Sequence, residues 1–232
     1  MNIKLRTTVI LLLIFAGTFQ LAAQKKQYTL SFDKGEVLDI LLLANNPGID
    51  ALFDRYKKTA FPVANKHSYQ PMPGFKIKKT IKGSGKANTF IFGKWDSLKK
   101  REDFLDAIVP AVPDFHEQRK AIFKHFVLAY YEMPSKTTFT IDRNKYNVVT
   151  SYWSKNKNMD TFLKGQKSNI TNYGGTQILV LQNGKTPKGY EYDPTVTIIT
   201  QWESQDAFEN FQKNTEKSVL KSIKNTHQFV LN

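Results

Sequence analysis

Short segments of alternating or continuous apolar residues run along this chain, and their order predicts an α+β fold. Strand patterns in the first half cover residues 28–32, 36–44, 75–82, 87–95 and 122–132. Apolar residues at helical spacing predict a helix after Asn46-Pro47-Gly48 and another after Ser97, which is a suitable N-cap. The first half therefore alternates strands with helices.

The second half repeats this order. It predicts strands at 137–141, 145–153, 176–182, 193–201 and 226–231, and helices at 158–171 and 204–222. Local motifs also recur, since Gly93-Lys-Trp95-Asp-Ser97 returns as Thr200-Gln-Trp202-Glu-Ser204. The two tryptophans are 107 positions apart, and the turn residues Asp33 and Asp142 are 109 apart. The chain therefore contains a duplicated unit of roughly a hundred residues, a size typical of one domain.

Each copy opens with a predicted β-hairpin and then reads strand-helix-strand-strand-helix-strand, which is the ferredoxin-like unit. Such a sheet carries helices on one face and leaves the other face apolar. We therefore expect two ferredoxin-like repeats, residues 24–134 and 135–232, that pack sheet to sheet as an α/β barrel within one chain.

The second copy carries a motif with a familiar pattern. Tyr173-Gly-Gly175 precedes one strand, and Gln201-Trp-Glu-Ser204 ends the next strand before a helix with Ala207 and Phe211. This resembles the dimeric α+β barrel superfamily, and in particular small bacterial domains related to antibiotic-biosynthesis monooxygenases. The first copy departs from the pattern, because it has Pro73-Gly74 in place of Tyr-Gly-Gly. The resemblance implies the fold and, for some relatives, cofactor-independent oxygenase chemistry.

Residues 1–23 have the features of a signal peptide. Lys4 and Arg6 precede an apolar stretch, and Ala22-Ala23 forms a small-residue cleavage site. We expect a periplasmic or secreted protein of a Gram-negative bacterium, without stable membrane insertion after cleavage. With no cysteine, the exported protein has no disulfides and depends on its core.

The mature chain is strongly basic. The formal charge of +14 becomes +12 once the signal is removed. Anionic surface polymers are candidate partners outside the cell, whereas the aromatic-basic pattern of nucleic-acid binding is absent, so we expect no nucleic-acid partner. The lysines of segment 75–82 alternate with apolar residues, which predicts an exposed edge strand.

The sequence favours no metal site and no cofactor. The four histidines, His67, His116, His125 and His227, lack metal-ligand spacing. Haem binding occurs in the superfamily but has no supporting residue here. Serine hydrolase and phosphate-loop motifs are also absent.

One candidate acid/base pair emerges from the expected strand order. The first and last strands of the unit are neighbours, and they carry Asp39 and His125. A buried carboxylate beside an imidazole would have shifted pKa values. The alternative is a structural pair, or two residues that never meet. Val148 stands at the Asp39 position in the second copy, so only the first copy could hold this site.

Aromatic residues with polar tips form the second candidate group. Tyr130, Tyr146, Tyr152 and Trp153 suit a pocket for a flat apolar ligand, although they equally suit a core. The leading hypothesis is an exported, soluble small-ligand-binding or interaction module, monomeric or homodimeric and not an enzyme. The alternative is a monooxygenase-like or isomerase-like enzyme for an aromatic or apolar molecule, with Asp39 and His125 as acid and base.

Overall fold

A computed structural model describes residues 26–156, 159–215 and 222–232. The predicted signal peptide lies outside these residues. In the described part of the chain, no helix has the length and apolar character needed to cross a membrane.

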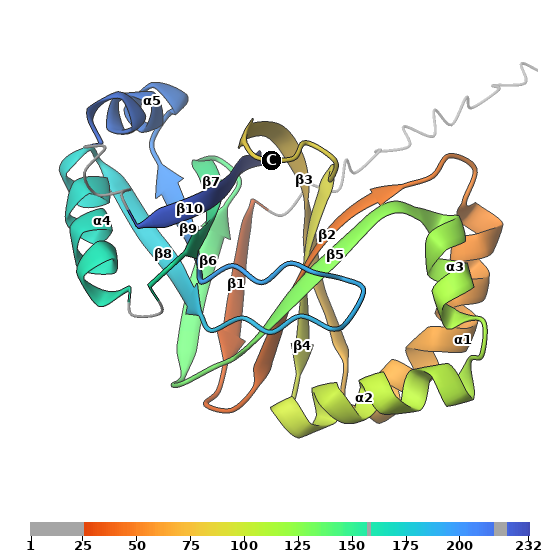
Figure 1. Cartoon of the computed structure of the whole chain (residues 1–232). Helices are drawn as coiled ribbons and strands as arrows, with labels where there is room; N and C mark the ends of the chain where they lie inside the picture. The colour runs from red at the N-terminus through yellow and green to blue at the C-terminus, as the bar shows by residue number, and fades with distance from the viewer. Residues whose placement is uncertain (1–25, 157–158, 216–221) are drawn as a thin grey trace, which may run out of the picture.

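The first repeat is a four-stranded antiparallel sheet with helices on one face (Figure 1). Its strand order, β5-β2-β4-β3, places the first and last strands of the unit side by side. The elements in chain order are β2 (Val37–Asn45), α1 (Asp50–Lys66), β3 (Gln70–Lys82), β4 (Thr89–Trp95), α2 (Leu98–Ala111), α3 (Phe115–Ile122) and β5 (Phe123–Glu132).

The second repeat has the same succession and the equivalent order, β10-β7-β9-β8. Its elements are β7 (Tyr146–Ser154), α4 (Asp160–Asn172), β8 (Gly175–Gln182), β9 (Val196–Trp202), α5 (Gln205–Asn214) and β10 (Ile223–Leu231). The predicted fold class, two tandem ferredoxin-like units, is confirmed. The predicted cap at Ser97 is confirmed, since its Oγ accepts from the backbone N–H of Lys100, and Ser204 Oγ accepts from that of Ala207 in the same way.

The two sheets join into one barrel. Strand β3 pairs with β10, so one eight-stranded sheet runs through both repeats. On the opposite side, the loop after β8 pairs with β5 through two hydrogen bonds between Tyr130 and Lys185, of 2.8 and 2.9 Å. The prediction that segment 75–82 is an exposed edge strand is therefore wrong. Its lysines point outward from a strand that β10 covers at its edge.

The main core lies between the facing sheets. It contains buried side chains from both repeats, among them Phe90 and Phe92 from β4, and Ile199 and Phe229 from β9 and β10. The Phe90 and Phe229 rings contact across the two halves, with centroids 5.7 Å apart. In Figure 1, helices α1–α3 lie at one end of the molecule and α4–α5 at the other, with the strands between them. The two repeats thus bury their apolar faces against each other.

The leading strands do not form the predicted hairpins. Strand β1 (Gln27–Phe32) pairs with β6 (Thr137–Asp142) of the other repeat, in a separate two-stranded ribbon. The inner face of this ribbon contributes Phe32 and Phe139 to the main core. Burial of these side chains between the sheets favours the exchange, because a local hairpin would leave each strand with only its own repeat to pack on.

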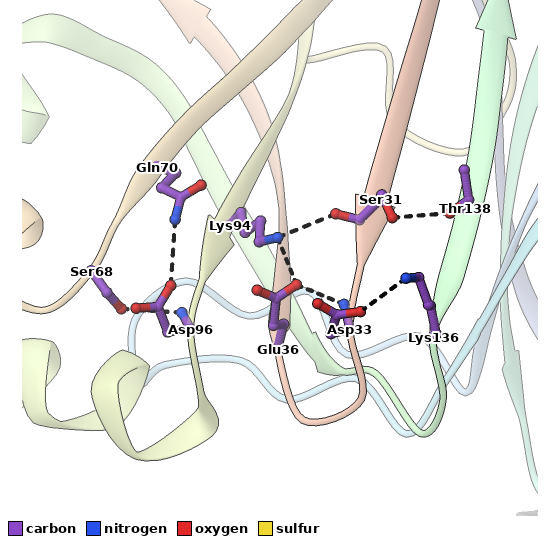
Figure 2. Close-up of polar contacts among 9 residues, drawn as sticks. All are labelled: Ser31, Asp33, Glu36, Ser68, Gln70, Lys94, Asp96, Lys136 and Thr138. Atoms are coloured by element: carbon purple, nitrogen blue, oxygen red, sulfur yellow. Dashed lines mark hydrogen bonds and ion pairs between the residues drawn. The ribbon is translucent and has the colours of Figure 1, made fainter.

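Polar contacts fasten the ribbon to the first repeat (Figure 2). Lys94 Nζ lies 2.6 Å from a Glu36 carboxylate oxygen and donates to the backbone carbonyl of Ser31 at 3.2 Å. The Ser31 hydroxyl lies 3.0 Å from that of Thr138, so the contacts continue from β4 through β1 to β6. Both charged side chains of the Lys94–Glu36 pair are largely buried. Salt therefore screens this ion pair less than it screens an exposed pair.

Candidate ligand-binding site

A cavity of about 110 Å³ lies between the sheet and the helices of the first repeat. Leucine and isoleucine side chains from β2, β4 and β5 form its floor, and rings and small side chains from α1 form its roof. Three charged residues share this apolar lining: Asp39 on β2, Arg101 on α2 and Arg119 on α3. A mostly apolar cavity with a few convergent polar groups is the usual form of a small-molecule site.

Asp39 and Arg101 form a buried ion pair at this cavity. Arg101 Nε donates to both Asp39 carboxylate oxygens, each at 3.0 Å. The side chains are 4% and 2% exposed, respectively. Burial raises the pKa of the Asp39 carboxyl above its usual range, while the positive charge of Arg101 acts in the opposite direction.

The rest of the Arg101 guanidinium lies among aromatic rings. Its central carbon is 4.9 Å from the ring centroids of both Trp95 and Tyr130. Arg101 Nη1 is buried and has no hydrogen-bond partner among the described residues. Buried donors are nearly always paired in native proteins, so this unpartnered N–H group is an exception.

The second repeat replaces both members of the ion pair. The ladder positions match, since Asp39 faces Gly93 in the first repeat and Val148 faces Thr200 in the second. Arg101 is the fourth residue after the capping Ser97, and the fourth after Ser204 is Phe208. Val148 and Phe208 are buried together in an apolar cluster with Trp202. The same fold is thus built once with a buried charge pair and once with apolar side chains.

The residue two positions before each tryptophan also differs between the two repeats. In the second repeat, the Trp202 indole N–H donates to Thr200 Oγ1 at 2.9 Å. In the first repeat Gly93 stands at that position, and a Cβ there would lie 2.8 Å from the Tyr69 ring. In the first repeat the Trp95 indole N–H is buried without a hydrogen-bond partner among the described residues, although it lowers the pKa of the Asp39 carboxyl. Gly93 therefore leaves room for Tyr69 at the cavity wall.

The equivalent space in the second repeat is nearly filled. The cavity between its sheet and helices, lined by Phe208 and Phe211, has a volume of only about 10 Å³. A wider hollow of about 220 Å³ adjoins this space and is lined by Tyr152, Gln166 and Gln212, among others. The buried charge pair occurs only beside the cavity of the first repeat, among the described residues.

The predicted pairing of Asp39 with His125 is wrong. His125 lies opposite Ala44 in the β2–β5 ladder, whereas Asp39 lies opposite Tyr130. The two positions are five residues apart along β2, roughly 17 Å at 3.4 Å per residue, and an odd separation places them on opposite faces of the sheet. Arg101, which comes from a helix, occupies the place that the prediction gave to His125.

The four aromatic candidates do not form one pocket. Tyr130 packs on Arg101 beside the cavity of the first repeat. Tyr146 and Tyr152 lie on the helix side of the second sheet, against Phe208 and Phe162. The Trp153 ring lies on the barrel side, against Tyr192. These side chains therefore belong to three separate regions.

His227 lies in a polar chain inside the barrel. Its Nδ1 is 3.0 Å from the Tyr192 hydroxyl, and its Nε2 is 3.0 Å from the Ser84 carbonyl oxygen. The Tyr192 hydroxyl is in turn 3.0 Å from that of Ser151. Burial lowers the pKa of His227, which favours a neutral ring that donates from Nε2 to the Ser84 carbonyl. In the described part of the chain, no cluster of His, Asp and Glu side chains could hold a metal ion.

Arg101 and Arg119 were not among the predicted site residues. One signal for Arg101 was present, because aligning Ser97 with Ser204 places an arginine opposite Phe208 inside an apolar helix face. Arg119 gave no such signal, since α3 has no counterpart among the described elements of the second repeat.

No family model and no curated protein matches this sequence. Among solved structures, an anthrone oxidase-like protein is similar with a TM-score of 0.49 and 16% identity, over 88% of this chain and 94% of that one. Chlorite dismutase from Candidatus Nitrospira defluvii is similar with a TM-score of 0.47 and 7% identity, over 87% of this chain and 92% of that one. By its own strand order, the chain has a tandem ferredoxin-like architecture.

Proposed function

We propose that this protein binds a small, ring-sized apolar molecule with an oxygen acceptor, in the cavity of the first repeat. The observation that carries this proposal is the joint replacement of Asp39 and Arg101 by Val148 and Phe208 in the second repeat. Replacing a buried ion pair by well-packed apolar residues often leaves the stability of a protein unchanged or raises it. The pair in the first repeat therefore has a role other than stabilising the fold.

The size of the cavity sets the size of the ligand. A dry apolar cavity of about 150 Å³ can hold benzene. The cavity here, at about 110 Å³, fits one ring if the surrounding side chains yield slightly or if part of the ligand extends outside. Two arginines line the cavity, Arg101 with its unpartnered Nη1 and Arg119, and both are donors available to the ligand's oxygen.

Benzamide, a single ring with a carbonyl oxygen, tests this proposal. We expect isothermal titration calorimetry to detect its binding to the wild-type protein. Ala60→Leu, which adds volume at a buried position of the cavity wall, should abolish binding. Ala111→Leu, the same change at an exposed position at the end of α2, is the control and should bind like wild type. Equal affinity in all three proteins would contradict the proposed site.

Acid/base chemistry by Asp39 and His125 is not part of this proposal, because the two lie on opposite faces of the sheet. The proposal also includes export of the protein, which rests on the signal-peptide features of residues 1–23. Mass spectrometry of the protein in the periplasm or medium tests export, and Gln24 is the expected first residue.

A further inference from the structure

A second arginine at the mouth of the cavity indicates which kind of oxygen acceptor the ligand carries. Arg119 lines both this cavity and a groove of about 630 Å³ between α3, β5 and the loop after β8. Phe123 and Phe126 also line both spaces. These three side chains therefore form the boundary between the apolar interior and the solvent-facing groove.

The positive charge of Arg119 has no acidic partner among the described residues. Its Nε donates to the Tyr56 hydroxyl at 2.9 Å. Its guanidinium carbon is 4.2 Å from the Phe115 ring centroid and 4.3 Å from that of Phe126. A buried charge is normally paired in a folded protein, and ring faces compensate only part of the desolvation cost.

The charges around Arg119 favour the binding of an anion. Within the cavity Asp39 and Arg101 neutralise each other, so Arg119 leaves one net positive charge. The groove adds Lys120 and Lys188 against one acidic residue, Glu117. A groove of this sign raises the local concentration of anions and guides them inward.

We propose that the ligand is a monoanionic aromatic acid, whose ring enters the cavity and whose carboxylate pairs with Arg119 at its mouth. This inference rests on the proposed function, because it uses the same cavity for the ring. A guanidinium can bind a carboxylate through two parallel hydrogen bonds, which fixes the orientation of the acid. The groove leaves room for a larger acid to extend toward Tyr190, whose hydroxyl is 2.9 Å from His116 Nδ1.

Benzoate and benzamide test the inference because they share a ring and nearly the same shape but differ in charge. A hydrogen bond to a charged group stabilises a complex more than one to a neutral group does. We therefore expect the wild-type protein to bind benzoate about tenfold more tightly than benzamide. Arg119→Gln should remove this preference and leave benzamide affinity within about twofold, which also shows that the variant is folded. Arg119→Lys should keep part of the preference. Lys120→Gln, an exposed charge in the groove, should reduce it less than Arg119→Gln.

The outcomes separate this inference from the function on which it rests. Benzamide binding without tighter benzoate binding would overturn the anionic ligand and leave the cavity as a site for neutral molecules. A benzoate preference that survives in Arg119→Gln would overturn the role of Arg119. Failure of the wild-type protein to bind either compound would overturn both proposals.

Discussion

Arg101→Met is expected to lower the free energy of unfolding by about 3–5 kcal/mol at pH 7. Methionine fills a similar volume, so the loss comes from leaving the Asp39 carboxylate in a buried site without its cation. Because burial already raises the pKa of Asp39, acidification protonates the carboxyl and removes the unpaired charge. The loss should therefore become smaller as the pH falls from 7 toward 4. Urea denaturation at both pH values measures it.

Lys99→Met is the matched control for this prediction. Lys99 lies two residues earlier on α2 and pairs with Asp103, but its side chain is 82% exposed. Such a surface pair contributes little, so the stability of this variant should stay close to that of the wild type. Equal effects of the two substitutions would show that the Asp39–Arg101 pair is no more important than a surface contact.

Phe229→Ala is expected to destabilise the protein by about 3–5 kcal/mol and to weaken both repeats together. Phe229 belongs to the second repeat and is 1% exposed, and its ring packs on Phe90 of the first repeat. Since the facing sheets share one core, loss of this ring removes packing from both. Hydrogen exchange should therefore become faster in β2 and β4 as well as in β7 and β9.

Val109→Ala provides the comparison, because Val109 is 39% exposed at the end of α2. Its effect on stability should be below about 0.5 kcal/mol. If Phe229→Ala speeds exchange in the second repeat alone, the two sheets would be independent units and the shared core would be rejected.

The sequence predicted the architecture well because a duplicated order of strands and helices constrains the packing. Each repeat needed cover for one apolar sheet face, and the other repeat supplies it. The pairing of β1 with β6 could not be predicted in the same way. Local turn signals at Asp33 and Asp142 favour hairpins, whereas the exchange is decided by long-range burial of Phe32 and Phe139.

The site was only half predictable. Asp39 stood out as a carboxylate in an apolar strand, and Val148 at the equivalent position shows that only the first repeat buries a carboxylate there. Its partner depended on which strand positions face each other, and a register difference of one residue reverses the face. The helix residue Arg101 reaches Asp39 from 62 positions away, a contact that strand periodicity does not reveal.

The pair of substitutions Asp39→Val and Arg101→Phe, which copies the second repeat into the first, tests the central claim most directly. The double variant should recover at least half of the stability lost in Arg101→Met, because an apolar pair avoids the buried charge. Calorimetry should nevertheless detect no binding of benzamide or benzoate. A double variant that binds both as the wild type does, or that is as unstable as Arg101→Met, would show that the charge pair serves the fold and not a ligand.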